Sequence, residues 1–168
     1  LGFCQPGRGG KLVEEGVTTL EGEVPEEIYT VPIGRGIVRK NGKDITLVAT
    51  SYMVNEAIKA TTNLKKDSID IEVIDLRSLK PLDKTLLFES VKKTGRLIIA
   101  DGGWEACGVA AEISALVAEN IFAYLRAPIK RVTLPNTPAP ASSSLEKAYY
   151  PDSETLIQAV KELWFKSN

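Results

Sequence analysis

The chain has 168 residues, of which 43% are hydrophobic, 26% charged and 7% aromatic, a composition that disfavours disordered, collagen-like and disulfide-framework proteins. Its 21 basic and 22 acidic residues leave a net charge of -1, without the positive field that nucleic-acid and anionic-membrane binders use. Because the chain has no histidine, it supplies no Ser-His-Asp triad, Cys-His pair or histidine metal ligand.

Residues 1–30 contain six glycines and two prolines and show little hydrophobic periodicity, which is typical of a linker or arm that is partly disordered. The chain begins at Leu1 rather than at a methionine, so we expect a fragment or a processed chain. The opening LGFCQPGRGG lacks the apolar stretch of a signal peptide, and no apolar run reaches the roughly 18 residues that cross a bilayer. Cys4 and Cys107 form no CxxC pair, which favours reduced thiols of a cytoplasmic protein.

Residues 31–168 are expected to form the folded domain. The run GIVRK, the turn signal Asn41-Gly42 and the run DITLVATSY predict a hairpin that enters a strand over Ile45–Thr50. Apolar residues then recur at helical spacing over residues 53–66. The segment IDIEVIDL at 69–76 is typical of a strand covered on both faces.

The same alternation continues through the second half of the chain. Pro81 with Asp83 predicts the start of a helix that runs through Val91, and Gly95 predicts its end. RLIIAD follows as a short buried strand, and the loop DGGWEACG leads into a helix over Val109–Leu125.

IKRVTL is the last predicted strand. After it, PNTPAPASSS is expected to run in an extended conformation, because each proline biases its predecessor toward extended geometry. A closing helix is predicted over Ser153–Phe165, with Asp152 or Ser153 as its N-cap. Together these elements predict an α/β fold, a three-layer α/β/α sandwich with a mostly parallel sheet of about five strands and one antiparallel edge strand.

Ligands of open α/β sheets bind at the carboxyl ends of the strands, so the loops after the strands hold the candidate residues. Arg77 is suited to grip a phosphate or carboxylate, or to pair with Asp75 or with an acid of a partner chain. The glycines of DGGWEACG permit close backbone approach, and free amides at the following helix start would suit an anion. The spacing matches neither GxGxxG nor GxxxxGK[ST], however, and Asp101 and Glu105 would repel a phosphate.

Trp104 either folds back on its own helix or inserts into a partner, as interface anchors do. Asp101 and Glu105 are either paired carboxylates for acid–base chemistry or a solvated or interface-paired couple. No catalytic, cofactor-binding or metal-binding residue is assigned. The predicted interface residues are Arg77, Asp101, Gly102, Gly103, Trp104, Pro138 and Pro140.

Three segments carry a family resemblance: VIDLRSLKPLD, IIADGGWEACGVAAEISALVAE and VTLPNTPAPASSSLEKAYYPD. In that order and spacing they resemble the carboxyl-terminal transketolase-type domain of the beta subunit of 2-oxo acid dehydrogenase decarboxylase components, of the pyruvate or branched-chain type. The resemblance runs from about Gly22 to the end, and GEVPEEIYTVPIGRGIVRKNGKDITLVATSYMVNEA resembles the segment that enters that domain. It implies the fold of the transketolase carboxyl-terminal domain.

The resemblance also implies a role. The parent enzyme would oxidatively decarboxylate a 2-oxo acid and pass the acyl group to lipoyl-lysine, using thiamine diphosphate and Mg²⁺ held by domains other than this one. This chain would be an assembly domain without turnover of its own. Its implied partners are an alpha subunit, a second beta subunit and the subunit-binding domain of the lipoyl acyltransferase, in the cytoplasm or, in a eukaryote, the mitochondrial matrix.

One departure from the family pattern lies at Asp101, Gly102 and Gly103, where many beta subunits carry His-Glu-Ala. The loop therefore has no protonatable imidazole, and we expect a divergent subgroup. Two alternatives remain open. One is the carboxyl-terminal domain of a transketolase, a deoxyxylulose phosphate synthase or an oxoacid–ferredoxin oxidoreductase. The other is a stand-alone regulatory module that binds an anion or nucleotide at DGGWEACG.

Overall fold

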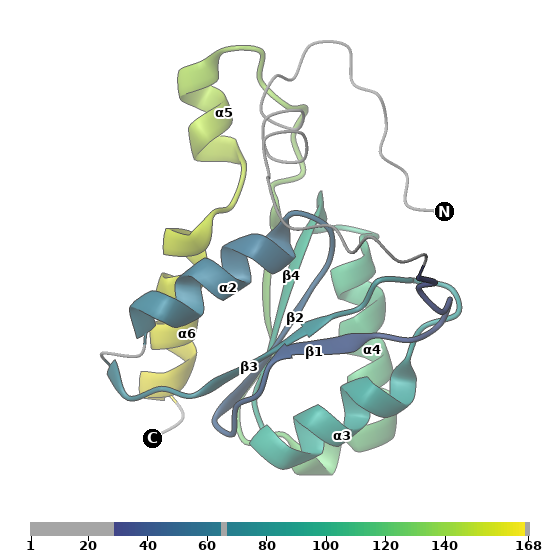
Figure 1. The fold of residues 1–168 in the computed structure, drawn as a ribbon. Coiled ribbons are helices and arrows are strands. Elements are labelled where there is room, and N and C mark those ends of the chain that lie inside the picture. Colours follow the sequence, from purple (N-terminus) through teal and green to yellow (C-terminus); the bar gives the residue numbers. More distant parts are fainter. Residues whose placement is uncertain (1–28, 65–66, 167–168) are drawn as a thin grey trace.

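The structure is a computed structural model in which residues 29–64 and 67–166 are described (Figure 1). The linker or arm predicted over residues 1–30 falls almost wholly outside the described residues. In chain order the elements are β1 (Ile37–Lys40), β2 (Ile45–Ala49), α2 (Met53–Leu64), β3 (Ile71–Asp75), α3 (Lys84–Thr94), β4 (Leu97–Trp104), α4 (Val109–Ile121), the 3₁₀ turn η2 (Phe122–Tyr124), β5 (Lys130–Leu134), α5 (Ser143–Tyr149) and α6 (Ser153–Lys166).

The strands form one sheet in the order β1-β3-β2-β4-β5. Strand β2 pairs in parallel with β3 and with β4, and β4 pairs in parallel with β5, whereas β1 runs antiparallel to β3 at the edge. Helices α2 and α6 pack on one face of the sheet, and α3 and α4 pack on the other (Figure 1). The predicted three-layer sandwich with one antiparallel edge strand is confirmed.

The predicted hairpin between the first two strands is wrong, because β3 lies between β1 and β2. All five residues of β2 are buried, and its backbone is bonded by parallel neighbours on both sides. The Asn41-Gly42 segment instead crosses the start of β3, where the amides of Lys43 and Asp44 donate to the Asp70 carbonyl at 3.2 and 2.9 Å. A Cβ on Gly42 would lie 2.2 Å from the Ile71 carbonyl carbon, so the glycine serves a backbone crossing.

A buried acid fixes this crossing. Glu72 is only 2% exposed, and its carboxylate accepts a hydrogen bond from the Gly42 amide at 3.3 Å and forms a salt bridge with Lys93 of α3. Burial of a carboxylate is tolerated only when it is paired and hydrogen-bonded. The pair therefore holds both the crossing segment and α3 against β3.

The helix ends follow the predicted capping signals. The Asp83 side chain accepts from the Leu86 amide at 3.1 Å at the start of α3, and Gly95 ends that helix in the left-handed region with φ 70°. At the start of α6, Asp152 Oδ1 accepts from the Thr155 amide at 2.9 Å, so Asp152 rather than Ser153 is the N-cap. No helix in the part of the chain that the structure describes is long and apolar enough to span a bilayer.

Three further elements differ from the prediction. Strand β4 continues through Trp104 instead of ending at Asp101, because the pairing with β5 shifts register and resumes at Leu134. Helix α4 ends at Ile121, and the turn η2 covers residues 122–124. Helix α5 was not predicted: the proline-rich run is non-helical up to Ser142, but the next seven residues form a helix.

Candidate functional site

Of the four non-glycine residues with positive φ in the described part of the chain, three lie in loops that follow the inner strands, and the fourth, Ser68, precedes β3. Ser51 after β2, Arg77 after β3 and Cys107 after β4 adopt positive φ angles of 51°, 57° and 57°. The left-handed conformation costs a residue that has a Cβ roughly 1–2 kcal/mol. Backbone strain of this kind often occurs at functional sites. Because parallel strands end at the same edge, the three loops lie together at the carboxyl edge of the sheet, which is the candidate site.

Arg77 is exposed at this edge. Its backbone amide donates to Asp75 Oδ1 at 3.1 Å, but the charge of Asp75 is matched by Arg39, whose Nε and Nη2 donate to Oδ2 at 3.1 and 2.9 Å. The internal Arg77–Asp75 ion pair is therefore not formed. Within the described ranges the Arg77 guanidinium takes part in no salt bridge, and its possible role toward a ligand or partner stays a prediction.

The two carboxylates of the loop after β4 have separate partners. Asp101 is 8% exposed, and its Oδ1 accepts a hydrogen bond from the Thr50 hydroxyl at 2.7 Å. Glu105 is at the surface, where its Oε1 accepts from Arg131 Nη2 at 3.1 Å. One acid thus stabilises the exit of β2 and the other ties the loop to β5, so the geometry offers no acid–base pair.

The glycines of this loop are required by packing. A Cβ on Gly102 would lie 2.8 Å from Tyr52 Cε1, one on Gly103 would lie 2.8 Å from Asp101 Oδ2, and one on Gly108 would lie 2.1 Å from the Trp104 carbonyl oxygen. The Glu105 and Ala106 amides donate to the Leu134 carbonyl at 3.0 Å and to Asn136 Oδ1 at 2.9 Å. These two amides are therefore used within the chain, and binding of an anion by the amides at the start of α4 stays a prediction.

Trp104 ends β4 and is 57% exposed. Its Nε1 donates to the Tyr149 hydroxyl at 3.2 Å, and that hydroxyl donates to the Thr137 carbonyl at 2.7 Å. The indole therefore contacts α5 and does not fold back on α4, while more than half of its surface stays open. Its insertion into a partner remains a prediction.

Pro138 is exposed and Pro140 half-buried on the segment between β5 and α5. This segment and α5 extend past the carboxyl end of β4 (Figure 1). The segment that contains both prolines therefore lies at the same end of the strands as Trp104, the last residue of β4. The predicted interface residues thus share one edge, although Asp101 is inside it.

Sequence reasoning missed two tyrosines at this edge. Tyr149 accepts the Trp104 bond. Tyr52 lies beside Gly102, and its hydroxyl is buried without a hydrogen-bond partner among the described residues. Neither position had a signal in the sequence. The contact of Tyr52 with Gly102 and the bond of Tyr149 with Trp104 each join residues that lie far apart along the chain.

The buried hydroxyl of Tyr52 predicts a pH dependence of stability. Burial, with smaller contributions from Tyr150, Glu56, Asp101 and Asp152, raises the pKa of Tyr52 far above its ordinary value of 10.0. Above pH 10 the unfolded chain therefore releases this proton while the folded chain keeps it, and stability falls as the pH rises. We expect Tyr52→Phe to lose less unfolding free energy than the wild type between about pH 8 and about pH 11 in urea titrations.

The matched control for this experiment is Tyr124→Phe, since Tyr124 is 51% exposed. That variant should keep the alkaline loss of the wild type. An equal loss in all three proteins would show that Tyr52 ionises alike in the folded and unfolded chain.

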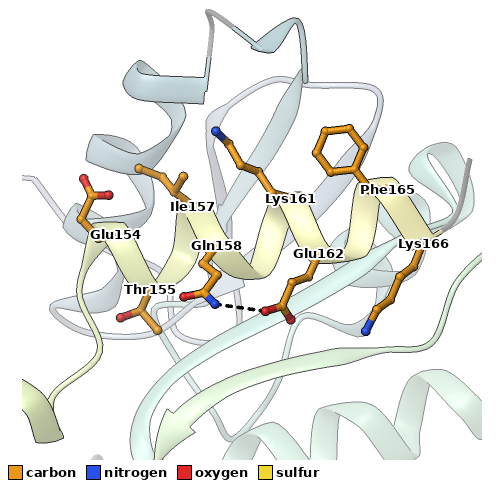
Figure 2. A pocket seen from close by; sticks show the side chains of 8 residues that line it. All are labelled: Glu154, Thr155, Ile157, Gln158, Lys161, Glu162, Phe165 and Lys166. Carbon is orange, nitrogen blue, oxygen red and sulfur yellow. Dashed lines mark hydrogen bonds between the residues drawn. The ribbon is translucent and has the colours of Figure 1, made fainter.

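A hollow of about 660 Å³ lies along α6, away from the carboxyl edge. Figure 2 shows its lining side chains in two rows that point away from each other, with Lys161 and Phe165 in one row and Gln158 and Glu162 in the other. Gln158 Nε2 donates to Glu162 Oε1 at 3.2 Å, and Glu162 also pairs with Lys130. Because its polar groups diverge and bond one another, this surface offers no convergent site of the kind that binds small molecules.

Comparison with known proteins identifies one matching family model and several similar beta subunits, each of which is longer than this chain. The family model of the transketolase C-terminal domain matches residues 34–156. The chain is 44% identical over 144 residues to the acetoin:2,6-dichlorophenolindophenol oxidoreductase subunit beta of Bacillus subtilis (strain 168), covering 86% of the chain and 42% of the relative. It is 42% identical over 145 residues to the pyruvate dehydrogenase E1 component subunit beta of Rickettsia felis, covering 86% of the chain and 44% of the relative.

Among solved structures, a split gene transketolase described as an inactive beta4 tetramer matches with a TM-score of 0.73 and 27% identity, over 89% of the chain and 47% of that protein. The chain thus spans less than half the length of each of these three proteins. The match covers β1 to the start of α6 in the family model, and it includes the whole carboxyl edge described above.

Proposed function

Because the chain belongs to the transketolase C-terminal domain family, we propose that it is the assembly domain of a beta subunit in a thiamine-diphosphate-dependent dehydrogenase. The observation that carries the proposal is the match, above 40% identity over 86% of the chain, to beta subunits of an acetoin and a pyruvate enzyme. In this proposal the chain holds subunits together and supplies no reacting group.

The carboxyl edge is the proposed contact surface. It presents Trp104, which is 57% exposed, and Arg77, whose side chain is exposed on a strained loop. Tryptophan and arginine are the residue types that most often dominate interface energetics. Gly102, Gly103, Pro138 and Pro140 lie at the same edge, and Asp101 supports it from inside through Thr50.

The cofactor is proposed to lie in other parts of the parent enzyme. Within residues 29–64 and 67–166, no three histidine, cysteine, aspartate or glutamate side chains are grouped to hold a metal ion. Asp101 and Glu105, the acids of the candidate site, are bonded to Thr50 and Arg131. We therefore assign thiamine diphosphate and Mg²⁺ no ligand among the described residues.

The proposed partners are an alpha subunit, a second beta subunit and the subunit-binding domain of a lipoyl acyltransferase, in the cytoplasm or the mitochondrial matrix. The solved relative described as a beta4 tetramer supports contact between beta subunits. Its lower identity, 27% against 44% and 42%, favours the dehydrogenase type over a transketolase.

The substrate of the parent enzyme is proposed to be a 2-oxo acid, with acetoin as a second candidate. Acetoin is a hydroxyketone, and the acetoin enzyme subunit is as similar to this chain as the pyruvate enzyme subunit. A domain that is equally similar in enzymes with two different substrates is suited to assembly, and we propose that the substrate pocket lies outside it.

Chimeric beta subunits test this proposal. The matched carboxyl-terminal parts of the Bacillus subtilis and Rickettsia felis subunits would each be replaced by this chain. We expect each chimera, expressed with its native partners, to keep the substrate of its host and a kcat within about tenfold of the host enzyme. Steady-state assays with acetoin and with pyruvate measure both quantities.

Host subunits that lack the carboxyl-terminal part provide the control and should not assemble. A chimera that assembles but takes on a different substrate would show that this domain selects the substrate. A chimera that assembles and is inactive would show that the domain contributes more than assembly.

A further inference from the structure

Two segments that meet at the edge of the sheet carry a surplus of positive charge. Residues 29–40 lead into and form β1, and residues 75–88 leave β3 and enter α3. Together they hold six basic and two acidic residues of the 21 and 22 in the whole chain. The rest of the chain is therefore net acidic, and the surplus of positive charge is a local feature of this surface.

Contacts between the two segments bring this charge together. Figure 1 shows the chain that enters β1 running beside the loop between β3 and α3. The Gly34 amide donates to the Ser78 hydroxyl at 2.8 Å, and the Gly36 amide donates to Asp83 Oδ2 at 3.1 Å. A Cβ on Gly34 would lie 2.8 Å from Pro81 Cγ, so the loops touch along their length. Residues that adjoin these contacts in the sequence are therefore neighbours in space.

Four exposed cations adjoin these contacts and are called the basic patch below: Arg35, Arg77, Lys80 and Lys84. Among the residues that the structure describes, none of the four takes part in a salt bridge. The two acids of these segments have other partners. Asp75 pairs with Arg39 at 2.9 Å, and Asp83 is 9% exposed and accepts hydrogen bonds from the Gly36 and Leu86 amides. The charge of the basic patch is thus left unmatched within the described residues.

Apolar side chains are exposed beside these cations. Ile33 is 80% exposed, Val31 49% and Leu79 40%, and all three lie on the same two loops. A surface that combines unmatched cations with exposed apolar side chains suits a protein partner, because the apolar area is buried on contact and complementary charge guides the encounter. Small anions bind in concave pockets, whereas all four cations are exposed. An anionic membrane would repel the net acidic remainder of the chain.

We propose that the basic patch, together with Ile33 and Leu79, binds an acidic polypeptide segment of a partner protein, with apolar side chains among its carboxylates. The inference rests on the proposed function, because Arg77 belongs to the contact surface given there, and it adds the chemistry of the partner. Carboxylates of the partner would pair with the four cations, and its apolar side chains would cover Ile33 and Leu79.

Fluorescence anisotropy of a labelled peptide of glutamate and leucine, titrated with the 168-residue chain, tests this proposal. We expect binding that weakens about tenfold between about 0.05 and about 0.3 M salt, because salt screens exposed charges. Glutamine at all four positions of the basic patch should weaken binding about thirtyfold, since each exposed ion pair changes an affinity by about two- to threefold. Ile33→Ser keeps every charge but removes apolar area, and should weaken binding about fivefold.

The matched control replaces four exposed lysines elsewhere by glutamine: Lys43, Lys59, Lys92 and Lys147. It removes the same charge and should weaken binding by less than about threefold, and circular dichroism should show both variants folded. An equal loss in the two variants would overturn the proposal, because net charge alone would then explain binding. Failure of the wild type to bind the peptide would also overturn it, and binding to phosphatidylserine vesicles instead would identify a membrane surface.

The peptide assay uses the chain alone, so its outcome is separate from that of the chimeric beta subunits. Loss of peptide binding with intact assembly and activity of the chimeras would overturn the basic patch alone. Peptide binding with chimeras that do not assemble would overturn the proposed function alone.

Discussion

Replacing Trp104 by alanine is expected to weaken subunit assembly about 30-fold or more, which corresponds to roughly 2 kcal/mol. The indole is 57% exposed in the chain alone, so most of its apolar surface is available for burial against a partner. Truncation of a tryptophan anchor at the centre of an interface typically has this effect. Sedimentation velocity of the chimeric beta subunits with their partners, over a dilution series, measures it.

Two variants separate the interface role of Trp104 from its hydrogen bond to Tyr149 of α5. Trp104→Phe loses the Tyr149 bond but keeps an aromatic face, and should weaken assembly far less than alanine does. Phe165→Ala removes a 75% exposed ring from α6, away from the carboxyl edge, and should leave assembly unchanged. If Trp104→Ala lowers the unfolding free energy of the chain by the same 2 kcal/mol or so and leaves assembly intact, the indole is structural.

The sheet could be predicted because its signals are local. The apolar runs of β2, β3 and β4 are buried on both faces as their sequences indicate, and Asp83 and Gly95 end α3 by side-chain and backbone bonds within a few residues. The pairing of β1 could not be predicted in this way, because its partner strand β3 lies about 30 positions further along the chain and is not the next strand. The Asn41-Gly42 signal is the same whether the chain turns back or crosses β3, and the Gly42 contact with Ile71 decides between them.

The end of β4 and helix α5 show the same limit. Gly102 and Gly103 are typical of a loop, yet in the structure they lie in a strand whose register shifts against β5. The prolines before Ser143 predict extended chain, but they contain no information on Tyr149, whose contact with Trp104 spans 45 positions. The weak intrinsic stability of a seven-residue helix is overridden by that tertiary contact.

The candidate site was predictable to the level of its edge. Arg77 and Trp104 follow strands, and parallel strands place such residues together. The partners of these residues were not predictable. An Arg77–Asp75 ion pair was suggested by their proximity in the sequence, but Asp75 instead forms a salt bridge of 2.9 Å with Arg39 of the antiparallel edge strand. The strained φ angles at Ser51, Arg77 and Cys107 also have no signature in residue type.

Replacing Gly108 by alanine is expected to lower the unfolding free energy by about 3 kcal/mol or more, and the melting temperature by roughly 10 °C for a chain of this size. The residue caps α4 with φ -79° and ψ 170°, angles that alanine adopts freely. Its Cβ, however, would lie 2.1 Å from the Trp104 carbonyl oxygen and 3.3 Å from the carbonyl carbon. Because a backbone atom is in the way, either β4 or α4 must shift.

Urea denaturation followed by circular dichroism measures this change, with Cys107→Ala as the matched control. Cys107 is exposed and adjacent, and its positive φ is the same strain for alanine as for cysteine, so its unfolding free energy should change by less than about 0.5 kcal/mol. A Gly108→Ala protein of wild-type stability would show that the loop relaxes without cost.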